Sequence, residues 1–133
     1  MKPVFADSFY FIAFFNERDH AHQRAVRFSP AFSQPLLTTD WILTEVADAC
    51  AKLPIRTEVV EFIHRLQKTP FVRIVPFSSE LFERGLELYR SRPDKEWSLT
   101  DCISFLVMED EDVSDALTGD KHFEQAGFKA LLK

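Results

Sequence analysis

The sequence predicts a single α/β domain in which helices cover both faces of a parallel central sheet. Short apolar segments typical of buried strands alternate along the chain with segments of helical periodicity, an order typical of parallel sheets. The chain has 133 residues, 46% of them hydrophobic, which suits one hydrophobic core rather than two. No repeat, linker or low-complexity segment interrupts it, so we expect residues 1–133 to form one domain.

Four short strands are expected, each rich in apolar residues and several bounded by proline. They lie at residues 3–6, 36–38, 71–75 and 116–118. Proline is tolerated where a strand begins or ends but not inside a central strand, and Pro35, Pro70 and Pro76 occupy such boundary positions. Fourteen Phe residues are expected to supply much of the core volume.

Helices are expected between the strands, each with its own start signal or periodicity. They lie at about 9–15, 20–28, 40–52, 56–67, 81–89 and 99–108, with one further turn of helix after Asp120. Ser8 is the expected N-cap of the first helix, and Thr39 or Asp40 of the third. Residues 56–67 carry an amphipathic stripe, whereas residues 99–108 are apolar nearly all round, which predicts a buried helix.

Composition excludes several classes of protein. Three Gly and no glycine-rich tract exclude a P-loop or a dinucleotide fingerprint. Cys50 and Cys102 are too few for a disulfide framework and lack zinc-type spacing. No apolar run reaches the roughly 18 residues that a membrane span needs, and the first residues lack a signal-peptide core. We therefore expect a cytosolic protein without a membrane partner.

Negative charge is concentrated in one part of the chain. The net charge is −5, which argues against broad affinity for nucleic acid. Residues 93–120 hold nine acids and one lysine, including the run Glu109–Asp112. That run is interpreted as a solvated helix end, although acids there oppose the helix dipole. Docking of a basic partner is the weaker alternative.

Three acids are expected where a strand ends or the buried helix begins, and a fourth one turn into the helix that follows the second strand. They are Asp7, Glu45, Asp101 and Asp120. Because ligands of open α/β sheets bind outside the carboxyl ends of the strands, these side chains could share one rim. Clustered carboxylates repel each other, and a divalent cation offsets that repulsion. An all-oxygen set favours Mg²⁺ or Mn²⁺, and such a site suits hydrolysis of phosphodiesters.

Each acid also has a purely structural interpretation. Asp7 could cap a helix, and Ser98 with Asp101 fits a capping box. Glu45 could be a surface acid and Asp120 a turn residue. The histidines offer no competing metal site, since His20 and His22 do not share a helix face and neither His64 nor His122 has an evident partner. Cys102 is interpreted as a core residue.

The residues around these acids resemble the PIN-domain family, in particular its small VapC-type toxins. The resemblance spans nearly the whole chain and rests on four motifs in order: Val4–Ser8 (VFADS), Leu43–Val46 (LTEV), Trp97–Cys102 (WSLTDC) and Leu117–Phe123 (LTGDKHF). It implies the three-layer α/β/α PIN fold. It also implies an endoribonuclease that depends on Mg²⁺ or Mn²⁺, with the four acids as its site.

The resemblance further implies roles for particular residues. Asp7 and Asp101 are the safest metal ligands, whereas Glu45 and Asp120 either bind the ion or orient water at it. Ser8 and Thr118 would hold the acids in place, and Thr100 would support the turn at Asp101. Residues expected to contact RNA phosphates near the rim are Arg18, Arg24, Arg92, Lys95 and Lys121.

The implied biology is that of a toxin in a type II toxin–antitoxin pair. Its partners would be an RNA substrate, an antitoxin protein that blocks the acidic groove, and a second copy of the chain in a homodimer. Gly119 departs from the family, many of whose members have a larger residue there, and the acidic run at 109–115 is unusually dense. The alternative function is a non-catalytic RNA-binding or protein-interaction domain. A haloacid-dehalogenase-type phosphatase or a receiver domain fits poorly, because the paired acids near the N-terminus are absent.

Overall fold

A five-stranded, all-parallel sheet forms the centre of the computed structural model, which describes residues 2–28 and 34–133. The strand order across the sheet is β3-β2-β1-β4-β5. The strands are β1 (Val4–Ala6), β2 (Leu36–Thr39), β3 (Val72–Val75), β4 (Asp115–Leu117) and β5 (Lys129–Ala130). The predicted α/β class with a parallel sheet is confirmed.

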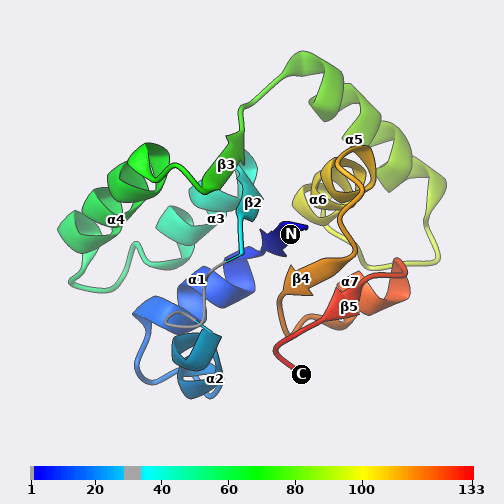
Figure 1. Cartoon of the computed structure of the whole chain (residues 1–133). Helices are drawn as coiled ribbons and strands as arrows, with labels where there is room; N and C mark the ends of the chain where they lie inside the picture. The colour runs from blue at the N-terminus through cyan, green and yellow to red at the C-terminus, as the bar shows by residue number, and fades with distance from the viewer. Residues whose placement is uncertain (1, 29–33) are drawn as a thin grey trace.

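Helices connect successive strands and form a layer on each face of the sheet. Within the described residues they are α1 (Ser8–Phe15), α2 (His22–Phe28), α3 (Asp40–Ala49), α4 (Arg56–Lys68), α5 (Ser79–Ser91), α6 (Leu99–Asp110) and α7 (Lys121–Gln125). The chain moves outward from β1 to β3 through α1–α4, then returns across the sheet to β4 and β5 through α5–α7. Because parallel crossovers are right-handed, this reversal puts the two groups of helices on opposite faces (Figure 1).

The order in which the chain adds strands to the sheet reverses between β1 and β4, which are parallel neighbours at its centre. Phe5 pairs with Ala116, and Ala6 pairs with Leu117. In open α/β sheets the ligand crevice forms at such a switch point, outside the carboxyl ends of the strands. Asp7 directly follows β1, and Thr118 directly follows β4. Residues from opposite ends of the chain therefore meet at this edge.

Close packing of α5 on α6 supports the second helix layer. A Cβ atom on Gly85 would lie 2.5 Å from Cγ1 of Ile103, which is fully buried. Glycine therefore allows the two helices to approach closely.

The prediction that phenylalanines fill the core holds for Phe5, Phe11 and Phe123. It is wrong for three others that are 41–58% exposed: Phe71, Phe77 and Phe82.

Several local predictions differ from the structure. α1 begins at Ser8, so its N-cap is Asp7 rather than Ser8. Asp7 has extended backbone and makes no capping hydrogen bond, because its side chain is turned toward β4. α3 ends at Ala49, before the expected end near residue 52. β5 was not predicted, since it has only two residues and is held by pairing with β4.

The prediction that Cys102 is a core residue is confirmed. Cys50 and Cys102 are both free and buried. No helix in residues 2–28 or 34–133 combines the length and apolarity needed to cross a membrane.

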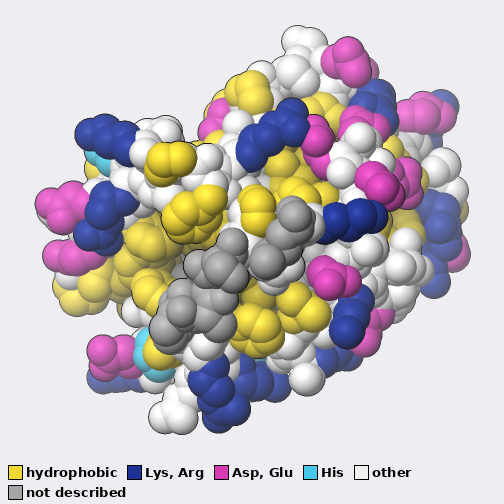
Figure 2. Space-filling view, in the orientation of Figure 1, with side chains coloured by type: hydrophobic (Ala, Val, Ile, Leu, Met, Phe, Trp, Pro, Cys, Tyr) yellow, Lys and Arg dark blue, Asp and Glu magenta, His cyan; other side chains and the backbone are white. Residues whose placement is uncertain are grey.

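Three members of the acidic run are paired with basic side chains from distant elements. The pairs are Asp110 with Arg84, Glu111 with Arg73, and Asp112 with Lys2. Lys2 precedes β1 and Arg73 lies near the start of β3, so the run sits at the amino edge of the sheet, opposite Asp7. Acidic and basic side chains accordingly alternate over α5 and α6 in Figure 2. These cations offset the unfavourable helix dipole.

Candidate metal centre

The four predicted acids lie on four different elements around the switch point. Asp7 follows β1, Glu45 lies on α3, Asp101 lies in the first turn of α6, and Asp120 is the N-cap of α7. Their charges act on one another: Asp101 and Glu45 both raise the pKa of Asp7, while Asp101 and Asp120 raise that of Glu45. The structure therefore brings all four within electrostatic range.

Asp7 is the most deeply buried of the four, with 5% of its surface exposed. Burial raises its pKa to about 7, and the neighbouring carboxylates add to the shift. Thr118 opposes the shift, because its Oγ1 donates a hydrogen bond of 2.8 Å to Asp7 Oδ2. Burying a carboxylate beside other carboxylates is costly unless a cation accompanies it.

Glu45 is held by two hydroxyl groups. Burial raises its pKa, while hydrogen bonds from the side chains of Ser8 and Thr100 lower it. Ser8 thus contacts a member of the acidic group, as the resemblance implies. Thr100 was expected to support the turn at Asp101, but in the structure its hydroxyl meets Glu45.

Asp101 takes part in the predicted capping box at the start of α6. Its backbone N–H donates to Ser98 Oγ at 3.0 Å, and its Oδ2 accepts from the Ser98 N–H at 3.1 Å. Burial raises the pKa of Asp101, and the charge of Asp120 adds to the effect. The capping role is therefore real, but it engages only one carboxylate oxygen.

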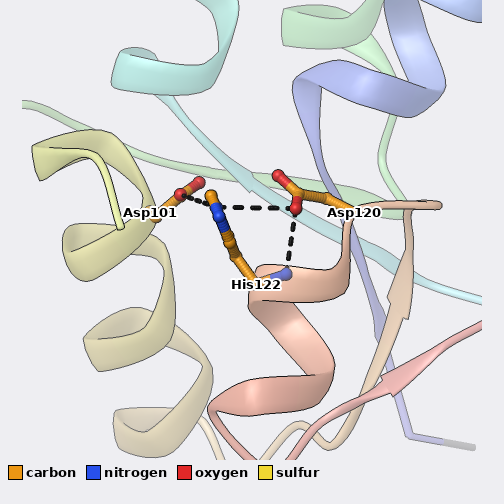
Figure 3. A group of neighbouring side chains, drawn as sticks. All are labelled: Asp101, Asp120 and His122. Atoms are coloured by element: carbon orange, nitrogen blue, oxygen red, sulfur yellow. Dashed lines mark hydrogen bonds and ion pairs between the residues drawn. The ribbon is translucent and has the colours of Figure 1, made fainter. Parts of the chain in front are cut away.

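His122 lies between Asp101 and Asp120 (Figure 3). Its Nδ1 is 2.9 Å from Asp101 Oδ2 and 3.5 Å from Asp120 Oδ1. An oxygen from each carboxylate and a ring nitrogen of His122 all lie within 4.8 Å of one another, close enough to share an ion. The expectation that His122 lacks a partner is wrong. Its spacing two residues after Asp120, at the start of a short helix, is the signal that could have indicated it.

The hydrogen bonds leave one oxygen of Asp101 and one of Asp120 without a partner among the described residues. Asp101 accepts through Oδ2, and Asp120 accepts the His122 N–H through Oδ1 at 2.9 Å. Asp7 is held by Thr118 at Oδ2 and by the Ser8 backbone N–H. A metal-binding carboxylate needs a fixed orientation and a free oxygen, and these hard oxygen donors fit Mg²⁺ or Mn²⁺.

Gly119 separates Thr118 from Asp120 and has a packing role. A Cβ atom at this position would lie 2.6 Å from Cζ of Phe9. The aromatic ring of Phe9 thus occupies the space that a larger side chain at position 119 would need.

Two of the basic candidates lie beside the acids. Lys95 and Lys121 line a polar pocket of about 280 Å³, whose other lining residues are Asp94, Glu96, His122 and Gln125. The guanidinium of Arg92 is engaged by Asp94 through two hydrogen bonds of 3.0 Å and lies over the Trp97 ring.

The two remaining basic candidates lie on other elements. Arg18 follows the end of α1 that is remote from Asp7, and Arg24 lies on α2. Within the described residues, no hydrogen bond or ion pair joins Arg18 or Arg24 to the four acids.

A parallel α/β sheet with a carboxylate cluster at its switch point defines a class of proteins with a candidate metal centre at the sheet edge. Within that class, this chain belongs to the PIN domain family, whose model matches residues 4–129. The PIN-like fold expected from the four motifs is thereby confirmed.

A solved structure shares the whole fold. It is the VapC20 toxin of Mycobacterium tuberculosis, described as cleaving the sarcin–ricin loop. The two proteins are 23% identical, and the superposition has a TM-score of 0.85 and covers 94% of this chain and 95% of VapC20. A comparison with functionally curated proteins gave no match.

Proposed function

We propose that this protein is a metal-dependent endoribonuclease of the VapC type, acting as a single PIN domain. The observation that carries the proposal is the orientation of Asp7, Asp101 and Asp120. Asp101 and Asp120 are each hydrogen-bonded through one oxygen and keep the other without a partner among the described residues. Asp7 is held between Thr118 and the Ser8 backbone N–H. Membership of the PIN family and the VapC20-like fold support the same activity.

Asp7, Glu45, Asp101 and Asp120 would together hold Mg²⁺ or Mn²⁺. When bound, such an ion activates water and stabilises the charge that develops on the phosphoryl group. The chain's own residues orient the carboxylates: Thr118 fixes Asp7, Ser8 and Thr100 fix Glu45, and Ser98 fixes Asp101. Burial of Asp7 limits its contact with bulk water.

RNA would reach the acids along the side that carries Lys95 and Lys121. The two lysines come from separate segments and share one pocket with His122, which contacts Asp101 and Asp120. Lysines at this position offset the repulsion between the acids and RNA phosphates. The dense acidic run lies at the opposite edge and is largely paired, so it does not oppose this approach.

A toxin of this kind, acting in the cytoplasm, would be paired with an antitoxin protein. The uncompensated acids favour an inhibitor that inserts a basic side chain, such as arginine, among them. Binding of that segment would compete with the metal ion and with RNA for the same carboxylates.

The protein would act as a homodimer. α5 leaves an exposed apolar stripe at helical spacing, made by Phe82, Leu86 and Tyr89, with Phe77 just before the helix. The adjacent face of α5 packs on α6 through Gly85. A second copy of the chain presenting the same stripe would form an isologous interface. Sedimentation of wild type and a Leu86→Glu variant tests this interface. A dimer in both proteins would contradict an interface formed by the α5 stripe.

Cleavage of total cellular RNA tests the ribonuclease directly. The purified protein, free of antitoxin, is incubated with Mg²⁺, with Mn²⁺ or with EDTA, beside an Asp101→Asn variant. Asp112→Asn is the matched control, because Asp112 is 92% exposed at the opposite edge of the sheet. Discrete products are expected from wild type and control, and none with EDTA or Asp101→Asn. RNA binding without cleavage in every lane would instead favour the non-catalytic RNA-binding domain.

A further inference from the structure

His122 makes contacts to two of the acids, and the assigned carboxylate set does not include it. Its backbone N–H donates to Asp120 Oδ1 at 2.9 Å, while its ring contacts Asp101 Oδ2 at 2.9 Å. All three side chains are at least half buried: 18% of the His122 side chain is exposed, 14% of Asp101 and 32% of Asp120. Solvent therefore competes little for these contacts.

The chemistry of the contact assigns a proton to Nδ1. An ionised carboxylate can only accept hydrogen bonds, so the ring nitrogen facing Asp101 Oδ2 must donate. Asp101 Oδ2 then receives two donors, the His122 ring and the Ser98 N–H. A protonated Nδ1 has no lone pair for a metal ion, so this nitrogen orients the carboxylate of Asp101 instead of binding the ion.

The remaining oxygens of both acids are turned away from these bonds. Figure 3 shows the second oxygen of Asp101 and of Asp120 on the same side of the dashed contacts, above them in this view. Those two oxygens are the ones without a recorded partner. His122 thus occupies the space between the two carboxylates and fixes which oxygen of each stays free.

We propose that His122 is a positioning residue that holds two acids ready for one divalent cation: Asp101 through its Nδ1–H and Asp120 through its backbone N–H. This inference rests on the proposed metal-dependent function. It adds a residue to the acidic quartet and states its role: a hydrogen-bond donor, not a metal ligand. Such supporting contacts govern metal affinity, and their loss costs about 10–100-fold.

Binding of Mn²⁺ to the purified protein, followed by electron paramagnetic resonance, tests the role. His122→Ala should weaken Mn²⁺ binding by about 10–100-fold. His122→Asn should retain most of the affinity, because its amide N–H can donate from near the position of Nδ1. His64→Ala, which removes an exposed imidazole on α4, is the control and should bind as wild type does.

Two outcomes of the Mn²⁺ titration would overturn the inference. Unchanged Mn²⁺ affinity in His122→Ala would show that the hydrogen bond from the His122 ring to Asp101 does not contribute to metal binding. Equal loss in His122→Ala and His122→Asn would show that the imidazole itself binds the metal. Circular dichroism of each variant establishes that it is folded.

A metal-free measurement separates this inference from the proposed function. A long-range ¹H–¹⁵N spectrum of the neutral imidazoles should show His122 protonated at Nδ1, with a resonance that shifts in Asp101→Asn. Protonation at Nε2 instead would overturn the inference. Absence of Mn²⁺ binding to wild type would contradict the proposed function, and the spectrum would still test the hydrogen bond.

Discussion

Thr118 Oγ1 donates a 2.8 Å hydrogen bond to Asp7 Oδ2, although the two residues are 111 positions apart. Thr118 Oγ1 also accepts a hydrogen bond from the backbone N–H of Asp120 at 3.0 Å. Both Thr118 and Asp7 are buried. One hydroxyl therefore links an acid from the first strand of the chain to the loop that carries another.

Replacing Thr118 by valine keeps the shape of the side chain and removes this link. Asp7 Oδ2 loses a donor and the Asp120 N–H loses an acceptor, so we expect a loss of about 1–3 kcal/mol in the free energy of unfolding. RNA cleavage should fall as well. Thr118→Ser is the matched control and should retain both. Urea unfolding measures the stability, and a valine variant as stable and active as wild type would contradict the expectation.

The raised pKa of Asp7 makes the stability of the metal-free protein depend on pH. Burial raises this pKa from 3.8 to about 7, so between these values the folded protein keeps a proton that the unfolded chain releases. The free energy of unfolding should therefore fall as pH rises through this window. Three pKa units correspond to a contribution on the order of 4 kcal/mol.

Asp7→Asn isolates this contribution from those of Glu45 and Asp101, whose pKa values are also raised. With EDTA present, the variant should lose less stability than wild type between about pH 5 and about pH 8. Mg²⁺ added at the higher pH should restore stability to wild type more than to the variant. Urea unfolding at both pH values measures this, and parallel curves for the two proteins would refute the assignment.

Lys95 and Lys121 should contribute to RNA affinity through phosphate contacts. Changing both to glutamine in the Asp101→Asn background should weaken RNA binding without the complication of cleavage. The slope of log affinity against log salt should become shallower by about 0.7 for each lost contact to a single strand. Fluorescence anisotropy measures the slope. Lys68→Gln, an exposed change at the end of α4, should leave it unaltered.

Gly85→Ala should destabilise the fold although alanine is the better helix former. The helical preference favours alanine by about 1 kcal/mol. The new Cβ would meet Ile103 Cγ1 at 2.5 Å, and overpacking a filled core costs about 1–3 kcal/mol. Because Ile103 is fully buried, it has little room to move. A thermal midpoint equal to or above that of wild type would show that α5 and α6 can separate freely.

The sequence predicted the sheet and the position of the acids well, because both follow from local patterns. Proline-bounded apolar segments indicate strands, and the carboxyl ends of parallel strands share an edge. The spacing of His122 two residues after Asp120 could have indicated their contact, but the contact of His122 with Asp101 needed the tertiary structure, since it joins residues 21 positions apart on α6 and α7. β5 was not predicted for a similar reason, because only its pairing with β4 defines it as a strand.

The ion pairs of the acidic run also needed the tertiary structure. The run suggested an exposed helix end, and Asp112 is indeed 92% exposed. Two basic partners of the run, Lys2 and Arg73, come from the segment before β1 and from β3, and no local pattern connects them to α6. Spatial proximity created by the fold decides these contacts.

The position of β4 beside β1 sets an order of events during translation. A nascent chain carries Asp7 and Glu45 long before Thr118 and Asp120 leave the ribosome, and without β4 the central strand lacks a neighbour. The acidic quartet is therefore incomplete until the C-terminal segment has emerged. The proposed nuclease would stay inactive until β4 and Asp120 have left the ribosome, and an antitoxin that recognises the complete quartet would have to bind after that point.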